Sequence, residues 1–362
     1  MKRAFFSKHK RIGINNELPA YRTGRHELPL KRNNFRRMKK LLILLLWVFP
    51  VFTNAQKFEY QVRFEGITDN REYFNPIAYA QTIMGSRGAF EVGIEIDQHR
   101  IRGGLSQLYE FGSDLDLNKP KLTMYYQYVD EKRELLFGAF PRAKRINFPF
   151  ARLTDTVLYY RPNIEGLFYE SRWNWGKENI FIDWTSRQTD FNRENFLVGF
   201  SGEVFYKNLF VENHILLFHN MGPRIDIPGD HIKDYLGFAV RAGVRTNETS
   251  QIKATLKAGA LGSSFRERSV TNGFINATSL FAEANARYKN YGIKTVLSSG
   301  GSHKFAFGDR FYGARNYMRT DLIWYFVNHE KVKGRINYAF HFIDWEDIDQ
   351  QQQLSLIYVF GN

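Results

Sequence analysis

Apolar and polar residues alternate along many short stretches of the chain, and this period of two restricts its fold more than any other feature. Between 88 and 97 every second residue from Phe90 to Ile96 is apolar, and the residues between them are Glu or Gly. Successive side chains of a strand point to opposite faces, so this pattern predicts a β-strand with one apolar and one polar face. It predicts about sixteen strands (14 to 18), at 57–65, 88–97, 100–110, 121–129, 132–140, 164–172, 178–187, 194–206, 209–219, 234–246, 251–262, 276–288, 291–299, 315–328, 332–343 and 350–360.

The connections between these strands alternate in length. Short turns are expected at 98–99, 130–131, 207–208, 289–290 and 328–331, and longer loops at 66–87, 141–163, 220–233 and 300–314. Barrels of the bacterial outer membrane have short periplasmic turns, long external loops and an even number of strands. Only a closed sheet satisfies its backbone groups in lipid, and about 16 strands enclose an aqueous channel. The sequence therefore predicts an all-β, transmembrane, antiparallel up-and-down β-barrel over residues 56–362, with apolar side chains facing lipid and water inside.

The segment 38–55 indicates export. Two lysines precede an apolar run that ends at Phe52, and small residues at 53–55 offer a cleavage position, as in a secretory signal peptide. Residues 1–37 are basic without an apolar period, which predicts a disordered extension or a start codon assigned too early. Residues 1–55 hold 13 Lys and Arg against 2 Asp and Glu, so without them the formal charge falls from +14 to +3. This small excess argues against a nucleic-acid partner.

Two local motifs resemble a known class. The export segment ends in Asn54-Ala55-Gln56, and the chain ends in a strand with Leu354, Leu356, Tyr358 and Phe360 on one face. With the alternating strands, these motifs resemble porin-like outer-membrane β-barrel proteins of Gram-negative, Bacteroidota-type bacteria. In such barrels the closing strand usually ends on an aromatic residue, whereas Gly361 and Asn362 follow Phe360 here. The resemblance implies an outer-membrane location and contact with membrane lipid and lipopolysaccharide. The sequence is compatible with a monomer and with a homo-oligomer, because the contact face of an oligomer would carry the same apolar pattern as a lipid-facing wall.

Charged residues at the polar positions of the strands are the candidate pore lining. An acidic group in the early strands would face a broader basic wall, and such a wall favours anions. We therefore predict a passive channel for small polar solutes, including anions or saccharides. The alternative is that these charges pair across neighbouring strands and only keep the wall wet. The candidates are Glu91, Glu95, Arg100, Arg102, Asp183, Arg187, Arg241, Arg245, Lys253, Lys257, Arg287, Arg319, Lys333 and Arg335.

The loop 141–163 is a second candidate site, because it combines basic and aromatic side chains. Aromatic faces can stack on sugar rings, while guanidinium groups hold carboxylates or phosphates. A long loop of this kind can fold into the lumen as a constriction, and the alternative is a plain external loop. The candidates are Arg142, Lys144, Arg145, Arg152, Tyr159, Tyr160 and Arg161.

Histidines are the candidate catalytic residues if the protein is an enzyme. The histidines His214, His219, His303 and His341 have acids and serines in the surrounding sequence, but the chain has no GxSxG, HExxH or P-loop motif. A lone histidine is more often a structural residue than a base, so we predict no enzyme, no catalytic residue, no metal and no cofactor. The alternatives to a channel are a non-conducting barrel that binds a partner protein or acts as an adhesin, and an outer-membrane enzyme.

Overall fold

The computed structural model describes residues 56–361, apart from 114–118, 144 and 226. The extension 1–37 and the export segment 38–55 lie outside the described residues and stay predictions. All described residues belong to one compact unit, Asn54–Asn362. No helix among them is long and apolar enough to cross a membrane.

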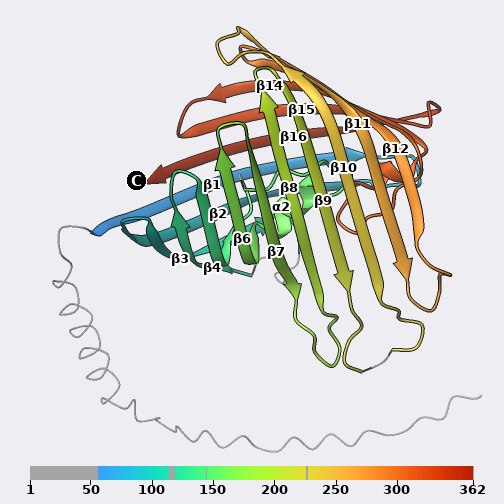
Figure 1. Cartoon of the computed structure of the whole chain (residues 1–362), viewed down its shortest axis with the longest axis horizontal. Helices are drawn as coiled ribbons and strands as arrows, with labels where there is room; N and C mark the ends of the chain where they lie inside the picture. Colours follow the sequence, from blue (N-terminus) through green and yellow to red (C-terminus); the bar gives the residue numbers. More distant parts are fainter. Residues whose placement is uncertain (1–55, 114–118, 144, 226, 362) are drawn as a thin grey trace, which may run out of the picture. The chain divides into compact units, whose positions relative to one another are not determined.

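Sixteen antiparallel strands form one closed barrel, which confirms the predicted fold class and strand number (Figure 1). Each strand pairs with its neighbours in sequence, and β1 pairs with β16 to close the ring. The strands are β1 (Gln56–Glu72), β2 (Gln81–Ile96), β3 (His99–Glu110), β4 (Lys121–Val129), β5 (Arg133–Pro141), β6 (Asn163–Trp173), β7 (Gly176–Ser186), β8 (Asn195–Tyr206), β9 (Leu209–Asn220), β10 (Lys233–Arg245), β11 (Ile252–Glu267), β12 (Ile275–Tyr288), β13 (Tyr291–Gly300), β14 (Asn316–Asn328), β15 (Val332–Ile343) and β16 (Asp347–Gly361).

The alternation in sequence becomes an alternation of faces. Along β9, Phe210, Leu216 and Phe218 point inward and are buried, whereas Ile215 and Leu217 point outward and are exposed. The other strands carry exposed apolar side chains on the same outer face. An apolar outer face with all strands paired suits a barrel in lipid, where backbone groups need partners within the protein.

The two ends of the barrel differ in their connections. At the end that holds both termini of the described chain, the strands are joined by short turns (Figure 1). Lys207 and Lys289 begin two of these turns with φ values of 54° and 52°, as two-residue hairpins require. The opposite end carries the longer loops.

The predicted loop 66–87 is too long. β1 and β2 continue to Glu72 and from Gln81, which leaves only 73–80 as a connection. The extra rungs escaped prediction because their outward positions carry polar residues such as Thr68, Asn70 and Thr82, which interrupt the contrast between an apolar and a polar face.

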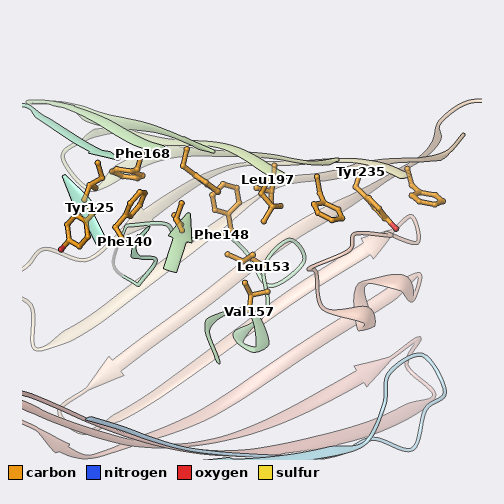
Figure 2. Packing of buried hydrophobic residues seen from close by; sticks show 14 residues of the cluster. Tyr125, Phe140, Phe148, Leu153, Val157, Phe168, Leu197 and Tyr235 are labelled. Carbon is orange, nitrogen blue, oxygen red and sulfur yellow. The ribbon is translucent and has the colours of Figure 1, made fainter. Parts of the chain in front are cut away.

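Two loops fold into the barrel and are packed there. The segment 142–162 contains helix α2 (Asp155–Tyr160), and the segment 301–315 contains the short 3-10 helix η3 (Arg310–Gly313). Figure 2 shows Phe148 of the first segment among a row of inward aromatic and aliphatic side chains of the wall, with Leu153 and Val157 of the same segment below it. A second buried cluster gathers Phe311 and Tyr312 of the other segment with residues of the wall. This packing corrects the expectation that water fills the interior throughout.

Candidate active site

The inner wall binds the first loop through buried arginines. Arg142 is fully buried; it forms an ion pair with Asp183 of β7 and donates hydrogen bonds to the carbonyls of Arg161 and Asn163. Arg152, also fully buried, donates to the carbonyl of Gly262 in β11. Burial lowers the pKa of Arg152 to about 10, which still leaves it charged at neutral pH. These contacts hold 142–162 against two separate parts of the wall, β7 and β11.

The second loop is fixed by a histidine. His303 lies between two serines of the wall: Ser263 Oγ is 2.9 Å from its Nδ1, and Ser279 Oγ is 2.8 Å from its Nε2. Burial and the neighbouring charge of Arg152 lower the pKa of His303 to about 4, so its ring is neutral at pH 7. Because both of its ring nitrogens are hydrogen-bonded to serines of the wall, His303 has a structural role: it holds the second loop in place.

The candidate lumen residues fall into three groups. Within the barrel, Arg241 lies 2.5 Å from Glu212 and 3.1 Å from Glu283, and Lys257 also contacts both glutamates. The contacts of Arg241 and Lys257 thus follow the alternative in which charged lumen residues pair across neighbouring strands. Glu91, Asp183 and Arg319 are buried as well, and Arg319 pairs with Asp321. Nearer the short-turn end of the strands lie Glu95, Arg100, Arg102, Arg245, Lys253, Arg287, Lys333 and Arg335, and Arg187 follows the end of β7 at the loop end.

The candidate residues of loop 141–163 occupy the interior. Arg145 lies 3.6 Å from Glu134, Tyr160 donates to Glu110 over 2.9 Å, and Arg161 donates to the carbonyl of Thr185. Tyr159 lies 3.2 Å from Gln353 of β16. Lys144 lies outside the described residues.

The outer wall carries a polar pair where β9 and β10 reach the loop end. Nδ1 of His219 lies 2.7 Å from Oδ1 of Asp234, and the two residues face each other in the strand register. Both occupy the outward positions of their strands, next to the lipid-facing Leu217 and Leu236. The pair is therefore on the face that elsewhere meets lipid.

A cavity of about 480 Å³ opens beside this pair on the outer face. Both apolar and charged side chains line it. Its lining includes Glu194, Phe196, Leu217, His219, Met221, Asp234, Leu236, Arg266, Arg268 and Phe274.

Aromatic contacts fix the imidazole. The ring of Phe196 lies 5.2 Å from that of His219, and Trp184 stacks on Phe196 at 5.4 Å. On the other side, Arg268 binds Asp234, with 2.9 Å between its Nε and Oδ2. This hydrogen bond raises the pKa of Arg268 above its ordinary value. Asp234 thus orients His219 through Nδ1 and leaves Nε2 as the nitrogen that can take a proton, the arrangement of a general base.

His219 was among the histidines that the sequence offered as candidate bases, whereas its partners Asp234, Phe196 and Arg268 were not predicted. The useful signal was the position of the polar residues: His219 follows Ile215 and Leu217 on the outward face, where an ionisable side chain is costly. Among the described residues, no three His, Asp or Glu side chains gather so that they could hold a metal ion.

The fold and the outward-facing apolar wall define a β-barrel protein of the bacterial outer membrane. Among solved structures, the chain resembles the loop L8 deletion mutant of OmpT from Vibrio cholerae, with 9% identity, a TM-score of 0.53, and 85% of this chain and 100% of that chain covered. It also resembles OccAB3 from Acinetobacter baumannii, with 11% identity, a TM-score of 0.50, and 84% and 100% covered. At these identities the likeness concerns the fold, and it confirms the predicted resemblance to porin-like barrels. No curated protein matches the chain.

Residues 52–360 match the sequence profile of the family described as Lipid A 3'-O-deacylase-type, and the chain belongs to this family. The family is one of enzymes. This family match overturns the prediction that the protein is not an enzyme; the absence of GxSxG, HExxH and P-loop motifs did not exclude one.

Proposed function

We propose that this protein hydrolyses an acyl ester of lipid A at the His219–Asp234 pair on the outer wall of its barrel. The observation that carries the proposal is the position of the pair, which lines a cavity on the lipid-facing wall at the loop end of the strands. In outer-membrane barrels the longer loops are extracellular, so this end lies at the outer leaflet. The name of the family, Lipid A 3'-O-deacylase-type, supplies the substrate and the bond.

The pair can perform hydrolysis without a covalent intermediate. Nε2 of His219 takes a proton from water as the water oxygen attacks the ester carbonyl carbon. The ester C–O bond then breaks, and the imidazolium returns the proton to the leaving sugar oxygen. Asp234 stabilises the imidazolium between these steps through the 2.7 Å bond to Nδ1. The products are a free fatty acid and a sugar hydroxyl.

The lining of the cavity suits a phosphorylated lipid. Leu217, Leu236 and Phe274 offer apolar surface to an acyl chain, while Arg266 and Arg268 offer guanidinium groups to phosphate. Lipid A carries both features, and lipopolysaccharide would then be the membrane partner of this site.

The test is the mass of lipid A from a Gram-negative host that expresses the full chain. The unmodified protein should remove the mass of one ester-linked acyl chain, and His219→Gln should leave lipid A intact. His99→Gln is the matched control, since His99 also faces outward, bonded to the hydroxyl of Tyr126 over 2.7 Å, but lies at the short-turn end. Unchanged lipid A with the unmodified protein folded in the outer membrane contradicts the proposal.

A second candidate function is passive diffusion of small polar solutes, including anions or saccharides. It is supported by two cavities along the inner wall, of about 460 and 300 Å³, that are both lined in part by α2 and share Asp155. Arg287, Lys333 and Arg335 line the larger one. The full chain in a planar bilayer should then give steady current steps with anion preference. Silent bilayers that contain folded protein would contradict passive diffusion and leave hydrolysis as the function.

A further inference from the structure

Asp234 is shared between two basic side chains. Its Oδ1 accepts from Nδ1 of His219 at 2.7 Å and from Nη2 of Arg268 at 3.4 Å, and its Oδ2 accepts from Nε of Arg268 at 2.9 Å. A carboxylate stabilises an imidazolium less when a guanidinium neutralises it. Arg268 therefore opposes the function of Asp234 that general-base catalysis needs.

The position of Arg268 allows its side chain to move away from Asp234. Its backbone is fixed, since its N–H donates to the carbonyl of Ile232 over 2.9 Å, but its side chain is 47% exposed. Exposed ion pairs contribute little to stability, so a stronger ligand can displace one partner. Arg268 lines the same cavity as His219, together with the apolar side chains that would hold an acyl chain.

We propose that Arg268 is a specificity-determining residue that senses the phosphate of the lipid headgroup: phosphate binds its guanidinium, Asp234 is released to His219, and hydrolysis begins. The inference rests on the proposed function. In this state a phosphate oxygen replaces the carboxylate as the acceptor of the guanidinium hydrogen bonds, so no charge is left without a partner. A lipid without phosphate would leave Arg268 on Asp234 and be hydrolysed slowly.

The other charged side chains that line the cavity do not have the contacts needed for the role proposed for Arg268. Within the described part of the chain, the charged side chains that line the cavity with His219 are Asp234, Glu194, Arg266 and Arg268. Arg266 lies 5.8 Å from the ring of Phe274 and has no ion pair with Asp234 among the described contacts. Glu194 bears the charge that would repel phosphate. Arg268 is thus the cavity residue whose contacts link the headgroup to the catalytic pair.

The experiment compares two lipids and two variants of the full chain in detergent micelles. The lipids are phosphorylated lipid A and the same lipid A after enzymatic removal of its phosphates. Arg268→Gln should lower kcat/KM for the phosphorylated lipid about 10-fold to 100-fold, the size of a lost charge-assisted contact. The same variant should raise kcat/KM for the dephosphorylated lipid, because Asp234 is then always free for His219.

The control is Arg224→Gln. Arg224 is an exposed arginine at the same end of the barrel, paired with Asp190 over 3.1 Å, and it does not line the cavity. It should leave both rates unchanged. A second readout is the pH dependence of kcat/KM for the dephosphorylated lipid: the acid limb should move to higher pH in Arg268→Gln, since a free Asp234 stabilises the imidazolium.

The outcomes separate this inference from the proposed function. Opposite changes for the two lipids support the switch. Equal losses for both lipids, or a loss for the phosphorylated lipid with an unmoved acid limb, overturn it while hydrolysis stands. If the unmodified protein hydrolyses neither lipid, the proposed function and this inference both fail.

Discussion

Two histidines on opposite sides of the barrel wall have different surroundings. Inside, His303 bonds to serines through both nitrogens and is 6% exposed. Outside, His219 bonds through one nitrogen to Asp234, and its ring borders a cavity of about 480 Å³. The inner histidine completes a packed structure. The outer one occupies a face where apolar residues would be more stable, and such a residue indicates function.

The same contrast extends to the arginines. Inside, the buried Arg142 forms an ion pair with Asp183 and hydrogen bonds with loop carbonyls. Outside, Arg268 is half-exposed and competes with His219 for one carboxylate. We therefore expect inner substitutions to change the packing of the loops and outer substitutions to change hydrolysis, with little exchange between them.

The largest effect should come from Asp234→Asn. An amide keeps the size of the side chain but cannot stabilise an imidazolium, so kcat/KM for lipid A should fall about 100-fold to 10,000-fold. Release of fatty acid from lipid A in micelles measures it. The barrel should still fold, as shown by heat-modifiable migration on a gel. Activity within threefold of the unmodified protein would show that the pair is not the base.

A single substitution should also disrupt the packing of the loop against the inner wall. Arg142→Ala leaves Asp183 as a buried charge without its partner, which costs about 3–5 kcal/mol. Loop 142–162 should then leave its place, and conductance in a planar bilayer should rise, while lipid A hydrolysis stays within about twofold. The control is Arg133→Ala, which removes an exposed ion pair with Asp130 at a short turn. Raised conductance together with lost hydrolysis would show that the two walls are coupled.

The barrel could be predicted from sequence because its signal is local. Alternation within each strand and the lengths of the connections determined the strand number and the closed sheet. The prediction failed where polar residues face outward, as at Thr68, Asn70 and Thr82, because they stand where the pattern requires apolar residues.

The candidate site could be predicted only in part because its residues come from different strands. His219 and Asp234 meet through the pairing of β9 with β10 across a loop, and Arg268 joins them from beyond β11. Each residue alone resembles an ordinary residue near a strand end. The outward position of His219 was readable in sequence, whereas its hydrogen bond to Asp234 required the register.

Acid should loosen the inner wall through His303. Its pKa is about 4, below the ordinary value of about 6.5, so the released loop binds a proton more readily than the packed one. The stabilisation is complete above about pH 6.5 and is lost as pH falls toward 4. Conductance should therefore rise between pH 6.5 and 4.5. In His303→Gln this rise should be much smaller, and an equal rise would assign it to other groups.

The smallest effect expected is on the aromatic support of the outer pair. Trp184 stacks on Phe196, which contacts His219, so Trp184→Ala removes about 0.5–1.5 kcal/mol of ring contact and should lower kcat/KM about 2-fold to 10-fold. Trp324→Ala is the matched control, because Trp324 also faces outward beside an aromatic ring, that of Phe326 at 6.0 Å, but lies on β14 away from the cavity. Equal losses in both variants would mean that tryptophan anchors the barrel in lipid generally. A loss confined to Trp184→Ala would show that the outer wall, like the inner one, depends on packing to hold its histidine in place.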